Sequence, residues 1–158
     1  MDVNHQKFMK RAIELSMKGM KKGDGGPFGA VVVRDGEIIG EGWNKVLSTN
    51  DPTAHAEVVA IRDACRKLGD FQLEDSILYT SCEPCPMCLG AIFWARPKAF
   101  YYGCTREDAA AIDFDDDFIY SQIDQAPEQR TIPAENLLRE EALKAFQYWK
   151  QMEKKTPY

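Results

Sequence analysis

The sequence predicts an α/β domain in which helices cover both faces of a central sheet. Segments with helical spacing of apolar residues alternate with short apolar strands along the chain, which is the pattern of this fold class. The length of 158 residues fits one domain, and 44% hydrophobic with 28% charged residues is ordinary for a packed globular protein. No repeat or linker divides the chain, so we predict a single domain over residues 1–158.

Local signals place the elements in order. The glycine-rich stretch Gly23–Gly26 ends the first helix, Asp35-Gly36 is a strong hairpin turn, and Asp51-Pro52 favours the start of a helix. Thr105 followed by Asp108 resembles a capping box that opens a further helix. The main expected elements are a helix over 8–20, strands over 28–33 and 37–43, a helix over about 53–68, a strand over 76–81, a helix over 84–94, a strand over 99–104 and a last helix over about 135–154.

Charge and cysteine content narrow the function classes. A net charge of −5 disfavours a broad surface for nucleic acid, because such surfaces are usually basic. No apolar run is long enough for a membrane span, and the N-terminus lacks the apolar core of a signal peptide. Three of the five cysteines lie in CEPCPMC, which suits a metal site in a reducing compartment better than a disulfide framework. We therefore expect a cytoplasmic protein, with Cys65 and Cys104 as core residues.

Two short motifs carry the chemistry. His55-Ala56-Glu57 lies at the start of one predicted helix, and Cys85-Pro86-Met87-Cys88 lies in the first turn of another. Cysteines three residues apart project from one helix face, and a helix N-terminus favours their thiolate forms. His55, Cys85 and Cys88 give Zn²⁺ three protein ligands, which is typical of a catalytic site that leaves one position for water.

Glu57 is predicted to be the catalytic acid and base. It is not needed for coordination, and a carboxylate beside the water can take a proton and later deliver it to a leaving amine. The pattern H-x-E … P-C-x-x-C is the signature of zinc nucleobase deaminases, and the sequence matches it at every position.

Three other interpretations of the cysteines remain open at this point. A structural zinc site would need a fourth ligand, for which only Cys82 is close. The spacing of Cys82, Cys85 and Cys88 is similar to an iron–sulfur run, but the fourth cysteine of such a run is missing. The cysteines could also be buried core thiols, although two prolines inside CEPCPMC disfavour an ordinary core helix.

Longer stretches resemble the compact bacterial guanine deaminases of the cytidine deaminase superfamily. The residues that carry this resemblance are GGPFGAVVV at 25–33, NDPTAHAEVVAIRDAC at 50–65, LYTSCEPCPMCLGAIFWARP at 78–97 and FDDDFIY at 114–120. The resemblance implies a three-layer α/β/α sandwich with a five-stranded mixed sheet, one zinc per subunit and a homodimer in which residues of about 135–158 can be exchanged. It also implies attack of water on C2 of guanine, which yields xanthine and ammonia.

The resemblance further implies residues that contact the purine, each with a plainer alternative. Asp116 would accept hydrogen bonds from guanine, although Asp115, Asp116 and Asp117 could simply begin a helix. Asn44 would hydrogen-bond the base, or it is only a turn residue. The remaining implied contacts are Phe28, Ala56, Trp94, Phe114 and Tyr158. Aromatic residues are usually core, and a terminal tyrosine is usually a frayed end.

Rival functions are another deaminase, acting on guanosine, cytosine or adenosine in tRNA, and a zinc-stabilised interaction module without turnover. An RNA editor should carry a basic face, whereas the last predicted helix mixes lysines with glutamates. A purely structural zinc module has no use for Glu57.

Overall fold

The computed structural model describes residues 4–158, which divide into a compact unit that ends at Asp116 and a second one over Asp117–Tyr158. The first unit contains α1 (His5–Lys21), β1 (Gly29–Arg34), β2 (Glu37–Trp43), α2 (Val46–Thr49), α3 (Ala56–Leu68), β3 (Ser76–Cys82), α4 (Pro86–Ala95), β4 (Ala99–Cys104) and α5 (Arg106–Ala110). The second contains α6 (Asp117–Ile123), the 3₁₀ turn η1 (Pro127–Gln129) and α7 (Arg139–Gln151). Among the described residues, every helix is too short or too polar to cross a lipid bilayer.

The sheet is mixed, as predicted, and has the order β2-β1-β3-β4. β1 pairs antiparallel with β2 and β3, and β3 pairs parallel with β4. Asp35 and Gly36 both adopt positive φ in the turn between β1 and β2, which confirms the hairpin.

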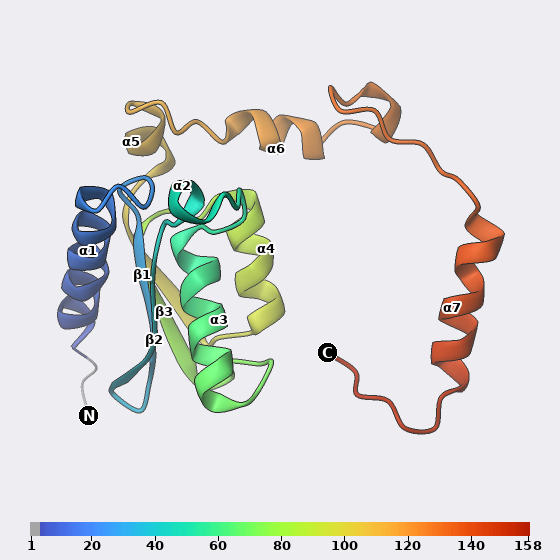
Figure 1. The fold of residues 1–158 in the computed structure, drawn as a ribbon, viewed down its shortest axis with the longest axis horizontal. Coiled ribbons are helices and arrows are strands. Elements are labelled where there is room, and N and C mark those ends of the chain that lie inside the picture. The colour runs from blue at the N-terminus through green and yellow to red at the C-terminus, as the bar shows by residue number, and fades with distance from the viewer. Residues whose placement is uncertain (1–3) are drawn as a thin grey trace. The chain divides into compact units, whose positions relative to one another are not determined.

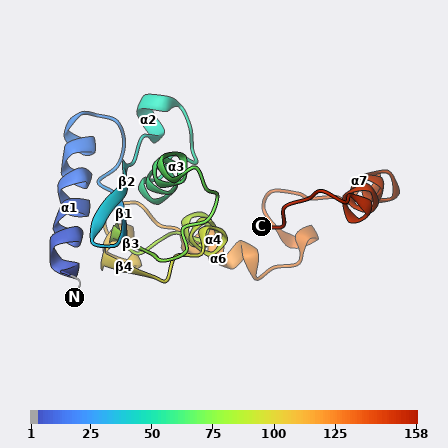
Figure 2. The ribbon, with the colours of Figure 1, turned by 90° about the horizontal axis from the view of Figure 1, so that it is seen from below.

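Helices lie on both faces of this sheet (Figures 1 and 2), with α1 on one side and α3 and α4 on the other. Residues of the central strands alternate between the two layers. Val31, Val33 and Tyr79 pack with Phe8 and Leu15 of α1. The opposite cluster consists of Ala30, Val32, Ala56, Ala60, Ala64, Leu73, Leu78, Ile92 and Ala95.

The expectation of five strands is wrong for the described part of the chain, where the sheet has four. Thr105 accepts a hydrogen bond from the Asp108 backbone, and the Asp108 carboxylate accepts one from the Thr105 backbone. This capping box, which the sequence predicted, turns the chain into α5 directly after β4. Further along, the segment 131–138 contains Pro133, which lacks the N–H that strand pairing requires, and it forms neither helix nor strand.

Two smaller expectations also need correction. The helix predicted from residue 53 begins at Ala56, because Asp51 accepts hydrogen bonds from the backbone and hydroxyl of Thr53 and so holds a turn. Cys104 is exposed instead of buried, since it ends the edge strand β4, whose last residues are all exposed. Cys65 packs against the core as expected.

Helix α3 packs very closely on β2 because both surfaces carry small residues. A Cβ atom added to Gly42 would lie 2.5 Å from the Ala56 carbonyl oxygen and 2.5 Å from the Ala60 nitrogen. Ala56 and Ala60 are fully buried at this contact. The N-terminus of α3 is therefore held at a fixed distance from the sheet.

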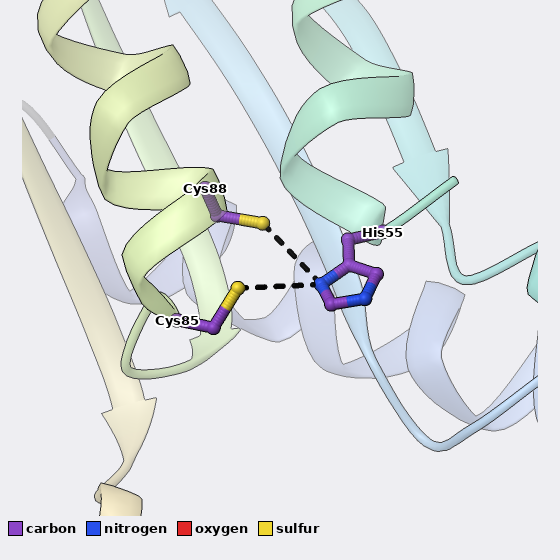
Figure 3. A group of neighbouring side chains, drawn as sticks. All are labelled: His55, Cys85 and Cys88. Atoms are coloured by element: carbon purple, nitrogen blue, oxygen red, sulfur yellow. Dashed lines mark hydrogen bonds between the residues drawn. The ribbon is translucent and has the colours of Figure 1, made fainter. Parts of the chain in front are cut away.

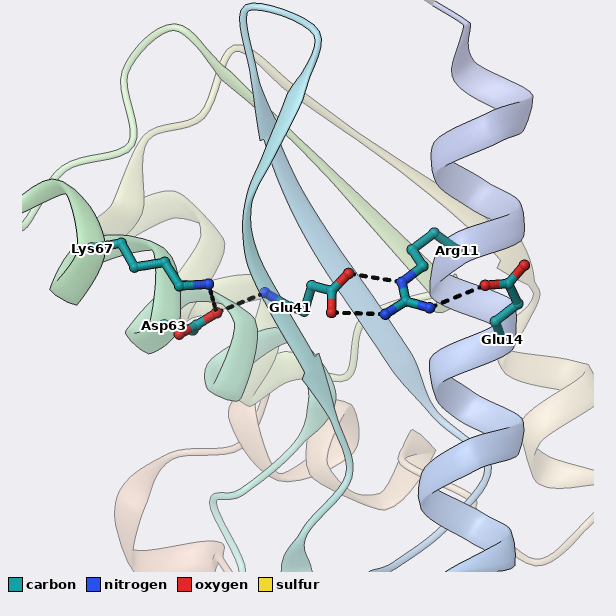
Figure 4. Close-up of polar contacts among 5 residues, drawn as sticks. All are labelled: Arg11, Glu14, Glu41, Asp63 and Lys67. Carbon is teal, nitrogen blue, oxygen red and sulfur yellow. Dashed lines mark hydrogen bonds and ion pairs between the residues drawn. The ribbon is translucent and has the colours of Figure 1, made fainter.

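A polar network joins the two helical layers across β2 (Figure 4). The Arg11 guanidinium of α1 donates two hydrogen bonds to the Glu41 carboxylate, at 2.7 and 3.0 Å, and a third to Glu14. On the other side, the Glu41 backbone N–H donates to Asp63 of α3, which also accepts from Lys67. Because β2 is an edge strand, this network covers a backbone donor that would otherwise be open to another strand.

The Arg11–Glu41 pair predicts a pH-dependent contribution to stability. The hydrogen bonds from Arg11 hold the pKa of the Glu41 carboxyl below its ordinary value. The stabilisation is therefore present above the unfolded-state pKa of about 4.3 and is lost as the pH falls through the folded-state pKa. We expect Glu41→Gln to lower the free energy of unfolding by about 0.5–1 kcal/mol at pH 7. Urea unfolding at pH 7 and pH 3 measures this. The exposed Glu37→Gln, outside this network, is the control, and an equal deficit for Glu41→Gln at both pH values would contradict the electrostatic origin.

Candidate metal centre and active site

The three predicted metal ligands meet at the N-termini of two neighbouring helices (Figure 3). His55 is the N-cap residue of α3, and Cys85 is the N-cap residue of α4 with Pro86 in its first turn. Cys88 lies one turn further along α4 and is fully buried. Each N-cap residue has an extended backbone, which turns its side chain toward the space between the helices.

The distances within this group suit a tetrahedral zinc ion. The Sγ atoms of Cys85 and Cys88 each lie 3.5 Å from His55 Nδ1. Bond lengths of about 2.3 Å to sulfur and 2.0–2.1 Å to nitrogen, at a tetrahedral angle, place S and N about 3.6 Å apart. Soft sulfur donors combined with an imidazole are also the ligands that zinc prefers. The donor set therefore fits the ion in both chemistry and spacing.

Cys82 does not belong to this group. Among residues 4–158, the histidine, cysteine and carboxylate atoms that lie within 4.8 Å of one another here come from His55, Cys85 and Cys88 alone. The thiol of Cys82 instead donates to the Thr105 carbonyl oxygen at 3.7 Å. A closed four-ligand zinc site and a three-cysteine iron–sulfur run both required Cys82, and the geometry disfavours both.

In the metal-free protein, the two ligand thiols shift each other's pKa in opposite directions. The hydrogen bond from Cys88, with a further contribution from His55, lowers the pKa of Cys85 to about 4. Donation to Cys85 together with burial raises the pKa of Cys88. Zinc binds thiolates, so its binding displaces the remaining proton from Cys88.

Glu57 lies in the first turn of α3 and is 6% exposed. Burial raises the pKa of its carboxyl above the usual range. A raised carboxyl pKa beside a metal group suits a residue that must both accept and release a proton near neutral pH. Its burial on the same helix turn as His55 agrees with the role of acid and base, which stays a prediction.

Thr80 is a site residue that sequence reasoning missed. It lies on β3, is 1% exposed, and its hydroxyl lies 3.1 Å from Glu57 Oε1. The available signal was its position in LYTSCEP, on a buried strand that runs directly into the cysteine motif. Threonine is so common in strands that this position alone did not separate it from a packing residue.

The residues expected to contact the purine differ in their burial and in their contacts. Phe28 and Phe114 meet edge to face, with ring centroids 5.0 Å apart. Ala56 is fully buried, whereas the Trp94 side chain on α4 is 63% exposed. Asn44 is buried at the end of β2, where its Oδ1 accepts a hydrogen bond from the Val46 backbone, as a turn residue does.

The aspartate run and the C-terminus complete the set. Asp116 is partly buried, whereas its neighbours Asp115 and Asp117 are exposed. Asp117 is the first residue of α6, where a carboxylate is favoured by the helix dipole. Tyr158 belongs to the second unit, and its side chain is 71% exposed.

Comparison with known proteins places the chain among the deaminases. Residues 2–104 match the family described as the cytidine and deoxycytidylate deaminase zinc-binding region. A guanine deaminase of Bacillus subtilis is 58% identical over 156 residues, which cover 99% of this chain and 100% of that protein. A tRNA-specific adenosine deaminase of Haemophilus influenzae is 43% identical over 108 residues, which cover 68% of this chain and 62% of that one.

Solved structures agree with these matches. The crystal structure of the Bacillus subtilis guanine deaminase superposes with a TM-score of 0.96 and covers 99% of both chains. A guanine deaminase of Nitrosomonas europaea, 31% identical, superposes with a TM-score of 0.67 over 72% of this chain and 66% of that one. With a family match over most of its length and a relative that covers all but 1% of it, this chain belongs to the cytidine and deoxycytidylate deaminase family.

Proposed function

We propose that this protein hydrolyses guanine to xanthine and ammonia at a zinc ion held by His55, Cys85 and Cys88. The observation that carries the proposal is the three-ligand group with both sulfurs 3.5 Å from His55 Nδ1 and with the buried Glu57 carboxyl at the start of the same helix. Guanine is supported as the substrate by the full-length relative of that name, whereas the adenosine deaminases match only part of the chain.

The proposed roles of the zinc ion and of Glu57 follow from the number of protein ligands. A zinc ion with three protein ligands supplies Lewis acidity, which lowers the pKa of a water from its bulk value to about 7. Glu57 accepts the proton of the water that attacks C2 of guanine. It passes this proton to the ring nitrogen, then takes the remaining proton of the hydroxyl added at C2 and delivers it to the amino group, which departs as ammonia while the C2 carbonyl forms. Burial of Glu57 keeps bulk water away from these transfers.

The base is proposed to lie among aromatic side chains. The Phe28–Phe114 pair offers an apolar wall, and the exposed Trp94 offers a flat ring for stacking. Ala56 lies between the proposed zinc ligand His55 and the proposed proton-transfer residue Glu57, and it lines the site at the start of α3. Asn44 hydrogen-bonds the purine in this proposal through its amide NH₂, because its oxygen is engaged with the Val46 backbone.

Asp116 is proposed to select guanine, which presents two donors, N1–H and the 2-amino group. A carboxylate accepts both, but it would face an acceptor at N1 of adenine. Asp116→Asn is expected to lower kcat/KM for guanine by at least about 10²-fold, because a buried mismatch of this kind discriminates strongly. Steady-state kinetics with Asp115→Asn and Asp117→Asn as matched controls test this. If Asp116→Asn behaves like wild type, a neighbouring aspartate or none contacts the base.

We also propose a homodimer in which about residues 135–158 are exchanged and Tyr158 helps to close the pocket. The supporting observation is that this segment carries large exposed apolar side chains, namely Phe146, Tyr148, Trp149 and Tyr158, which a second copy of the chain could cover. The cytoplasm is proposed as the compartment because the five cysteines are free, which suits a reducing environment.

A substrate panel tests the proposed function. The purified protein is incubated with guanine, guanosine, adenine, cytosine, cytidine and a tRNA anticodon stem-loop, and released ammonia is measured. We expect turnover of guanine well above that of every other substrate. Preference for the stem-loop or for another base would overturn guanine as the substrate, and no ammonia from any of them would overturn the deaminase activity itself.

A further inference from the structure

Beyond the residues already assigned, we propose that Thr80 is a positioning residue for the reaction: its hydroxyl holds Oε1 of Glu57 and so aims the other carboxyl oxygen at the reacting atoms. This inference rests on the proposed function, since it assumes that Glu57 transfers the protons.

The Thr80 hydroxyl lies between two acceptors. It is 3.1 Å from Glu57 Oε1 and 3.1 Å from the carbonyl oxygen of Cys82, two residues further along β3. A hydroxyl carries one hydrogen but also accepts hydrogen bonds. Thr80 can therefore donate to Glu57 when the carboxyl is ionised. Once Glu57 is protonated, the Thr80 hydroxyl can accept a hydrogen bond from the carboxyl and donate its own hydrogen bond to the carbonyl oxygen of Cys82.

The strand fixes the position of this hydroxyl. Thr80 lies in the middle of the sheet, paired with Ala30 of β1 on one side and Tyr102 of β4 on the other. Its side chain points to the same face as Leu78, whose cluster includes Ala56 at the start of α3. Because β-branched side chains are stiff at χ1, the hydroxyl is held in place before any substrate arrives.

Three variants test the proposal. Thr80→Val keeps the β-branched shape and removes the hydroxyl, whereas Thr80→Ser keeps the hydroxyl. Ser76→Ala is the matched control, because it removes a buried hydroxyl from the same strand that has no hydrogen-bond partner among residues 4–158. For each variant, kcat and KM for guanine, zinc content and thermal unfolding are measured on the zinc-loaded protein.

We expect Thr80→Val to lower kcat by about 10–100-fold, which is the usual effect of losing a group that orients a site residue. KM should stay within about twofold and zinc at one ion per chain, while Thr80→Ser and Ser76→Ala keep kcat within about threefold of wild type. A Thr80→Val enzyme with near-normal kcat would overturn the proposal. A Thr80→Ser enzyme as slow as the valine variant, or zinc loss in Thr80→Val, would also overturn it and assign Thr80 to packing or to the metal site.

The outcome is separable from that of the proposed function. If wild-type protein fails to release ammonia from guanine, the substrate proposal fails, and the same variants are then compared on whichever substrate the panel identifies. If wild type turns over guanine and Thr80→Val does too, only the role of Thr80 fails.

Discussion

Replacing Glu57 with glutamine is expected to lower kcat for guanine by about 10²–10⁴-fold while zinc stays at one ion per chain, because the positioned carboxyl acts as general base and general acid. Glutamine keeps the shape and hydrogen-bonding capacity of the side chain but cannot carry a proton between substrate atoms. The neutral amide also avoids placing a charge at a position where burial already raises the carboxyl pKa.

The measurement pairs ammonia release with metal content on the same sample. Glu37→Gln, a substitution of an exposed residue at the hairpin, controls for the loss of one carboxylate and should behave as wild type. A Glu57→Gln enzyme that turns over guanine normally would remove the residue from the mechanism. Loss of zinc in this variant would instead show that Glu57 supports the metal site.

Replacing Cys85 with serine is expected to cost both the metal and the activity. Only His55 and Cys88 would remain in the group of potential ligands, and a serine hydroxyl does not replace a thiolate, so zinc content should fall well below one per chain. Without Lewis acidity, which contributes several kcal/mol, kcat should drop by more than about 10³-fold.

The exposed Cys104→Ser is the matched control for this variant, because it also removes one free thiol. It should retain zinc and activity. If Cys85→Ser retained the full metal content, the assignment of this ligand would be wrong. If it lost the metal and still released ammonia at the wild-type rate, the reaction would not depend on the site at all.

The parts of the structure that could be predicted from sequence are those governed by local physics. The hairpin at Asp35-Gly36 was predictable because the turn demands positive φ, and α5 was predictable because Thr105 and Asp108 satisfy each other's backbone donors. The metal group was predictable for the same kind of reason. Cys85 and Cys88 share one helix face, and only a histidine from elsewhere was needed to complete the set.

What could not be predicted depends on contacts between distant residues. Thr80 is separated from Glu57 by 23 positions, and the two residues meet only because helix α3 packs on the face of the sheet to which Thr80 points. The start of α3 was predicted too early because the Asp51 side chain accepts a hydrogen bond from the Thr53 backbone within a turn. The same kind of hydrogen bond can also cap a helix, so the sequence does not distinguish the two. The four strands were predicted from local patterns, whereas the fifth strand was implied by the family resemblance alone. The exposure of Cys104 has no local signal, since it depends on where the sheet ends.

Zinc titration of metal-free protein, with the initial rate of xanthine formation from guanine followed as zinc is added, tests the zinc-dependent deamination most directly. We expect no turnover without metal and a rate that rises in proportion to zinc and reaches its plateau at one equivalent per chain. Xanthine formation by the metal-free protein, or a zinc-loaded protein that leaves guanine unchanged, would contradict it.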